Sequence, residues 1–251
     1  MQGKLKHLEK LAKLVGLEIN IDKTKAMKIN STSTASLELN NQQIELVSSL
    51  CYLDIITTPE GGAQEDIDNR LKKARAAFGR LQPIWKSSQI SRTTKVRIFR
   101  SCVKSVLTYG SETWLTSKST SQKLQVFINR CLRIICVIFW PRHISNKDLW
   151  IITGEEPIGR QIRRRKWKWI GHTLSKPANN IAKMSLEWNP QGSRRPGRPR
   201  NTWRRSVKSE LENGGLTWSQ VKQIAQNRTR WRCQVEALCP QEELGEKKKK
   251  R

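Results

Sequence analysis

Residues 119–138 read STSQKLQVFINRCLRIICVI, and this stretch decides how the longer part of the chain folds. Its apolar residues recur at steps of three and four, which is the spacing of one face of an amphipathic α-helix. The same spacing predicts helices over residues 63–85 and 91–109, with Ser91 or Thr93 as the N-cap of the second. Three helices of this length bury one core, so we expect a helical bundle.

The residues before this bundle have a different pattern, in which one helix precedes several short strands. Residues 4–15 have helical spacing, and Gly16 marks the C-terminal end of that helix. Asn40 and Asn41 suit the positive φ of a tight hairpin turn. Alternation of apolar and polar residues predicts short strands over 17–20, 37–39, 44–47 and 50–56. The sequence therefore predicts an α+β chain that begins with a small antiparallel sheet.

The residues after the bundle are rich in Trp and Arg. Their spacing predicts shorter helices over 161–174, 203–211 and 218–238, and the Pro and Gly of 192–200, GSRRPGRPR, exclude regular structure there. We expect four parts along the chain, which are a strand-containing segment 1–62, a helical bundle 63–140, a basic helical region 141–240 and a disordered basic tail 241–251.

The net charge of the chain points to a polyanionic partner. It contains 48 Lys or Arg against 21 Asp or Glu, a formal net charge of +27. Such cations neutralise phosphates and release their counterions, so RNA or DNA is the expected partner. A ribosomal-type structural protein, or a basic fragment of a larger protein, has the same composition.

No membrane partner is expected. The longest apolar stretch, residues 134–140, is far shorter than the roughly 18 residues of a membrane span. The N-terminus lacks the apolar segment of a secretory signal, so we expect a nuclear or cytoplasmic protein in a reducing compartment.

The basic, Trp-rich region is the expected contact with nucleic acid, because Arg and Lys bind phosphates and Trp stacks on unpaired bases. Trp167 and Trp169 lie two residues apart on the predicted helix, so at least one of them is expected to be exposed. Most other Trp residues are expected to be core aromatics. The expected contacts are Arg163, Arg164, Arg165, Lys166, Trp167, Arg194, Arg195, Arg198 and Arg200.

Six Cys and three His raise the question of a zinc site. Structural zinc sites often open with two ligands two to four residues apart, and the pairs Cys131 with Cys136 and Cys233 with Cys239 are spaced more widely. We expect no metal site, although a cluster of Cys233, Cys239 and His172 stays open. Buried free thiols are expected at Cys51, Cys102, Cys131 and Cys136.

Several collinear stretches resemble the reverse transcriptases of non-LTR retrotransposons. Residues 16–25, GLEINIDKTK, resemble the segment after the catalytic Asp-Asp motif, and residues 51–54, CYLD, resemble the primer grip. Segments similar to the family's thumb and connection region are KVRIF at 95–99, LTYGSETW at 107–114, NRCLRII at 129–135, RKWKWIGH at 165–172 and GRPRNTW at 197–203. Together they look most like the C-terminal part of an RTE-like endonuclease–reverse transcriptase.

The resemblance implies roles for several residues. Residues 1–62 would be a palm remnant with primer-grip-like strands, and 63–140 a thumb-like bundle. Tyr52 and Leu53 would grip a primer end, or else be ordinary strand residues. Lys23 matches the palm lysine that assists pyrophosphate departure as a proton donor, with Lys25 as the alternative carrier. An exposed lysine in a turn is the structural alternative for Lys23.

The resemblance also shows what this chain lacks. Polymerase chemistry needs carboxylates that hold two Mg²⁺ ions, and the family's catalytic aspartates would precede Met1. None of the five Asp residues, Asp22, Asp54, Asp66, Asp68 and Asp148, lies in an Asp-Asp pair. We therefore expect no catalytic residue and no cofactor here, with Mg²⁺ implied for the intact family enzyme. The expected function is that of a truncated reverse transcriptase that binds RNA or DNA; a stand-alone nucleic-acid-binding module or a non-functional pseudogene product is the alternative.

Overall fold

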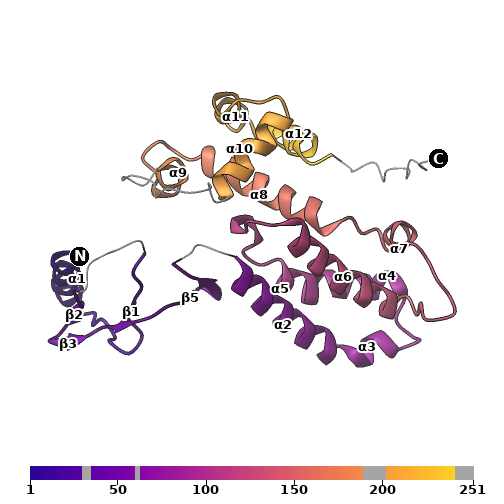
Figure 1. The fold of residues 1–251 in the computed structure, drawn as a ribbon, viewed down its shortest axis with the longest axis horizontal. Coiled ribbons are helices and arrows are strands. Elements are labelled where there is room, and N and C mark those ends of the chain that lie inside the picture. Colours follow the sequence, from indigo (N-terminus) through magenta and orange to yellow (C-terminus); the bar gives the residue numbers. More distant parts are fainter. Residues whose placement is uncertain (30–34, 60–62, 189–201, 241–251) are drawn as a thin grey trace. The chain divides into compact units, whose positions relative to one another are not determined.

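The computed structural model describes residues 1–29, 35–59, 63–188 and 202–240 (Figure 1). The chain divides into two compact units, Met1–Asp66 and Ile67–Arg251. Short strands lie in the first unit and most helices in the second, which confirms the expected α+β class. The boundary expected at residue 140 stays a prediction. In the described part of the chain, no helix is long and apolar enough to cross a membrane.

The first unit contains, among its described residues up to Thr57, one helix and three strand pairs. Its elements are α1 (Gln2–Leu14), β1 (Lys25–Ala26), β2 (Glu38–Leu39), β3 (Gln42–Gln43), β4 (Glu45–Leu46), β5 (Leu50–Tyr52) and β6 (Ile55–Thr57). The expected single antiparallel sheet is wrong, because β1 pairs with β4 in parallel while β2–β3 and β5–β6 form separate antiparallel pairs. Residues 17–20 form no strand.

Two tight turns shape these hairpins. Asn40 and Asn41 have φ of 50° and 59°, which confirms the turn expected there. The strand expected over 50–56 is instead the β5–β6 hairpin, because Leu53 and Asp54 have φ of 47° and 67° and reverse the chain. Leu is an unusual residue for a left-handed turn, so periodicity alone did not indicate it.

The bundle of the second unit includes two long helices, α2 and α6. Its elements are α2 (Gln64–Arg80), α3 (Gln82–Lys86), α4 (Arg92–Ile98), the π-helix η1 (Phe99–Lys104), α5 (Ser105–Leu107), the 3₁₀ turn η2 (Ser111–Thr113) and α6 (Lys118–Ile135). Ser91 caps α4 by accepting from Thr94 N, as expected. The apolar face of α6 is buried, with Leu124, Ile128 and Leu132 at most 1% exposed.

The remaining helices are α7 (Asn146–Thr153), α8 (Ile158–Leu174), α9 (Ile181–Glu187), α10 (Trp203–Asn213), α11 (Trp218–Ile224) and α12 (Arg228–Leu238). The single helix expected over 218–238 is two helices, because Asn227 caps a new one at Arg228. Helix α8 lies between the two helical groups (Figure 1), packing on α6 and η2 as well as on α11 and α12. Its Trp167, Ile170 and Leu174 join a second core with α10, α11 and α12.

Candidate nucleic-acid interface

The basic run of α8 faces carboxylates within the fold. Arg164 forms an ion pair with Glu156 and another with Glu236, where Nη2 lies 2.9 Å from Oε2. Arg165 Nη2 lies 2.8 Å from Glu112 Oε1. These contacts compensate much of the charge that the sequence presents as a continuous basic stretch. Arg163 is half-buried and has no carboxylate partner among the described residues.

Lys166 and Trp167 are buried and share one carboxylate. Lys166 Nζ lies 2.6 Å from Glu210 Oε1, and Trp167 Nε1 donates to Glu210 Oε2 at 2.8 Å. Lys166 is 5% exposed and Trp167 is 0% exposed. This burial does not favour a contact with a ligand at the surface, and the contacts expected of Lys166 and Trp167 stay a prediction. Trp169 is the more exposed member of the Trp pair, at 38%.

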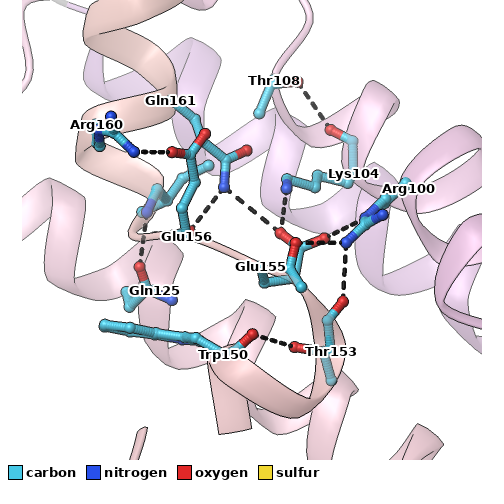
Figure 2. A network of polar contacts seen from close by, with 12 residues as sticks. Arg100, Lys104, Thr108, Gln125, Trp150, Thr153, Glu155, Glu156, Arg160 and Gln161 are labelled. Carbon is cyan, nitrogen blue, oxygen red and sulfur yellow. Dashed lines mark hydrogen bonds and ion pairs between the residues drawn. The ribbon is translucent and has the colours of Figure 1, made fainter. Parts of the chain in front are cut away.

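Another carboxylate, that of Glu155, joins the π-helix to the corner between α7 and α8 (Figure 2). Arg100 Nε lies 2.6 Å from Glu155 Oε1, and Lys104 Nζ contacts Oε2. Arg100 Nη2 also donates to the carbonyls of Thr153 and Gly154, at 2.8 and 2.6 Å. Burial lowers the pKa of the Lys104 ammonium, and the Glu155 charge opposes that shift. These cations hold the fold together, so they are poor candidates for a ligand contact.

A groove beside α6 differs from these clusters, because its cations have no carboxylate next to them among the described residues. We call it the α6 groove; its volume is about 610 Å³ and its lining includes Val126, Arg130, Arg133, Ile134, Phe139 and Asn146. Arg133 Nη2 donates to Asn146 Oδ1 at 2.8 Å, which fixes its guanidinium, and Arg130 is exposed. No acidic residue of the described chain lines the groove. Its two arginines are therefore available to an anion.

The loop after α6 exposes two aromatic rings, and the first of them, Phe139, lines the groove with these arginines. Ile138 N donates to Arg133 O at 2.9 Å and Val137 N to Ile134 O at 3.1 Å, a Schellman-type end of the helix. Arg142 N then donates to Phe139 O at 2.9 Å and closes a turn. Phe139 is 57% exposed and Trp140 is 83% exposed. The turn therefore holds both rings at the surface.

Sequence reasoning missed this site because it assigned residues 119–138 to the core. Val126, Arg130 and Arg133 recur at steps of four and three, which places them on one face of α6. The adjoining residues 139–143, FWPRH, combine aromatic and basic side chains after a helix end. That combination is the signal in the sequence from which the groove could have been found.

The first-unit residues to which the resemblance gives roles are all exposed: Lys23, Lys25, Tyr52 and Leu53. Lys23 N donates to Asn20 Oδ1 at 2.9 Å within a turn, which is the structural alternative considered for Lys23. Lys25 Nζ lies 2.9 Å from Glu45 Oε2. Tyr52 and Leu53 are each 67% exposed. Nothing in these contacts assigns a proton-transfer role to either lysine.

Four of the expected contacts, Arg194, Arg195, Arg198 and Arg200, lie outside the described residues. Among the Cys residues, Cys131 is buried as expected, while Cys51 and Cys102 are exposed, which corrects the expectation of buried thiols there. Cys51 lies in β5 and Cys102 in the π-helix η1, and each side chain is exposed there. Within the described ranges, no three His, Cys, Asp or Glu side chains gather where they could hold a metal ion.

The Asp residues do not fit the two-metal site of an intact polymerase. Asp66 Oδ1 accepts from Ile56 N at 3.2 Å, Asp68 pairs with Lys123, and Asp148 Oδ2 accepts from the Ser145 hydroxyl at 2.7 Å. Each of these three carboxylates is engaged in a separate contact within the fold. These three carboxylates therefore do not form a site for two Mg²⁺ ions.

Comparisons with known proteins give two matches. Residues 77–109, from the end of α2 to the turn after α5, match a domain of unknown function, DUF6451. A protein of Caenorhabditis elegans that is described as an uncharacterized transposon-derived protein is 24% identical over 229 residues, which cover 86% of this chain and 82% of that protein. This similarity supports a transposon-related origin for the chain. No solved structure matches.

Proposed function

We propose that this chain derives from the reverse transcriptase of a non-LTR retrotransposon, similar to the RTE-like group, and that it binds RNA or DNA without catalysing synthesis. The collinear motifs from residue 16 to residue 203 support the reverse-transcriptase ancestry. The similarity to a transposon-derived protein supports it at a coarser level. The net charge of +27 supports a polyanionic partner.

The observation that carries the binding proposal is the α6 groove. Arg130 and Arg133 line it without a neighbouring carboxylate, whereas Arg164, Arg165 and Lys166 of α8 are paired with glutamates inside the fold. A cation that already has a carboxylate partner gains little from a phosphate, because that partner must be displaced. Arginines without a carboxylate partner, beside a hollow surface, bind phosphate without such a displacement.

Salt-dependent binding tests the proposal. The full chain is titrated into a fluorescein-labelled oligonucleotide at several salt concentrations, and anisotropy gives the affinity. Changing Arg130→Glu is expected to weaken binding and to make the slope of log K against log salt shallower by about 0.7 to 0.9 for each phosphate that the variant no longer neutralises. The matched control is Arg230→Glu, which makes the same charge change at an exposed position of α12.

Equal weakening in the two variants would show that net charge alone drives binding and would overturn the assignment to the α6 groove. No measurable binding by the unaltered chain would overturn the function itself. A primer-extension assay with template, primer, dNTPs and Mg²⁺ checks the other half of the proposal. We expect no extended product; product that disappears after Asp22→Asn would contradict the proposal.

A further inference from the structure

The exposed aromatic pair after α6 is not explained by phosphate binding. Trp140, at 83%, is the most exposed of the ten Trp residues, and Phe139 beside it is 57% exposed. Burial of a large aromatic ring is favourable, so a fold that leaves two neighbouring rings in water retains a surface for a partner. The partner must suit both these rings and the arginines next to them.

Phe139 and the two arginines line the same hollow. Arg130 and Arg133 are one helical turn apart on α6, and Phe139 lines the groove beside them. The hydrogen bond from Arg142 N to Phe139 O fixes the turn that carries Phe139 and Trp140. Alternating phosphates and bases along an unpaired strand offer the same two chemistries, anion and flat ring, in succession.

We propose that the α6 groove and the exposed turn that follows α6 form a binding site for single-stranded RNA or DNA, in which Phe139 and Trp140 stack on unpaired bases while Arg130 and Arg133 contact the flanking phosphates. The inference rests on the proposed function and adds the class of strand. In a duplex the base faces are already stacked on one another, and a protein reads the base edges with an element that projects into a groove of the DNA. The α6 groove is a concave surface, so it can accommodate a single strand but cannot project into the groove of a duplex.

A protein partner is the competing occupant, because aromatic residues and Arg are also common at protein interfaces. The absence of acidic residues from the described lining favours the nucleic acid. A protein partner for this surface would itself need to be acidic, and its capture would not depend on whether an added oligonucleotide is paired.

The experiment compares one labelled oligonucleotide, about 15 nucleotides long and without self-complementarity, as a single strand and as a blunt duplex. The full chain is tested unaltered and as Phe139→Ala, Trp140→Ala and Trp140→Phe. Removal of one stacked ring is expected to weaken single-strand binding about 5- to 150-fold and to leave duplex binding unchanged. Trp140→Phe should retain most of the affinity because it keeps a ring.

The matched control is Trp188→Ala, which removes another Trp that is 63% exposed, outside the α6 groove. It should alter neither affinity. Because all these rings are exposed, the circular dichroism and melting temperature of each variant should equal those of the unaltered chain. Equal weakening on single strand and duplex, or no weakening, would overturn the inference. An unaltered chain that prefers duplex would overturn it while leaving nucleic-acid binding intact, and a chain that binds neither form would overturn both proposals.

Discussion

The indole of Trp231 occupies the space in which a side chain at Gly171 would lie. A Cβ built on Gly171 would be 1.8 Å from Trp231 Nε1, far inside van der Waals contact. Gly171 is in α8 and Trp231 is in α12, so the close approach of these two helices depends on a missing methyl group. The same indole packs edge-on against Trp167, with ring centroids 6.3 Å apart.

Gly171→Ala is therefore expected to destabilise the chain by about 1 to 3 kcal/mol, because an added methyl group must displace a packed tryptophan. Urea unfolding followed by circular dichroism gives the change. Gly79→Ala is the control: Gly79 is also in a helix, and nothing lies within 4 Å of its added Cβ. Its free energy of unfolding should rise by about 0.5 to 1 kcal/mol, since Ala is the better helix former. Two variants of equal stability would contradict the packing described.

Glu210→Ala is expected to be among the most destabilising substitutions in the second core. It leaves the Lys166 ammonium buried without a counter-charge and the Trp167 N–H without an acceptor, and breaking a buried pair costs about 3 to 5 kcal/mol. The control on the same helix is Glu212→Ala, whose exposed ion pair with Lys208, at 3.8 Å, contributes little. Chemical denaturation of both variants decides the matter, and a small effect at Glu210 would show that Lys166 reaches water.

Val137→Gly is expected to stabilise the chain by up to about 1 kcal/mol. Val137 has a φ of 54°, a left-handed conformation that costs an L-residue about 1 to 2 kcal/mol, and its side chain is 65% exposed, so the substitution removes little buried surface. Val126→Gly is the comparison, since it removes an exposed Val from the regular part of α6 and should cost about 1 kcal/mol. The two urea midpoints should move in opposite directions; a decrease in both would rule out backbone strain at Val137.

Alkylation should divide the Cys residues by burial. Burial raises the pKa of the Cys131 thiol to about 12 and that of Cys239 to about 11, so both stay protonated and unreactive at pH 8. Iodoacetamide should label the exposed Cys51, Cys102 and Cys233 first, as read by peptide mass spectrometry. Rapid labelling of Cys131 in the folded chain at pH 8 would contradict its burial.

The raised pKa of the Cys131 thiol makes the stability of the chain depend on pH. The unfolded chain loses the Cys131 proton near the ordinary thiol pKa of 9.0, whereas the folded chain keeps it until about 12. The contribution of this thiol to stability is therefore complete below pH 9 and is lost as the pH rises through that window. In Cys131→Ala this part of the pH dependence should be absent.

The long helices were predictable because their apolar spacing is local information. The periodicity of 119–138 predicted α6 nearly to its ends, and residue type and position narrowed the N-cap of α4 to Ser91 or Thr93, of which the structure shows Ser91. The β5–β6 hairpin was not predictable, because Leu53, the first of its two left-handed residues, rarely adopts that conformation.

The basic run of α8 shows a second limit of prediction from sequence, which is that local residues do not reveal distant ion-pair partners. Its charges are evident in the sequence, but the carboxylates that compensate them come from far along the chain: Glu210 is 44 residues from Lys166, and Glu236 is 72 residues from Arg164. Tertiary contacts decide which cations are free, and no local pattern encodes them. For the α6 groove, the sequence does show aromatic and basic side chains at 139–143, but the fold is needed to show which face of α6 remains uncovered.

Helix α8 is a structural member of two cores at once. Ile158 and Ile162 in its first half are at most 3% exposed, and Ile158 N donates to Gln125 of α6 at 2.8 Å, while Trp167, Ile170 and Leu174 in its second half belong to the core of α10, α11 and α12. Because α8 is one continuous helix, a change that displaces it from one core also displaces it in the other. A stop codon at the start of α8 would remove a wall of the first core together with the whole of the second, so a shortened chain closes the first core only if it extends through Ile162.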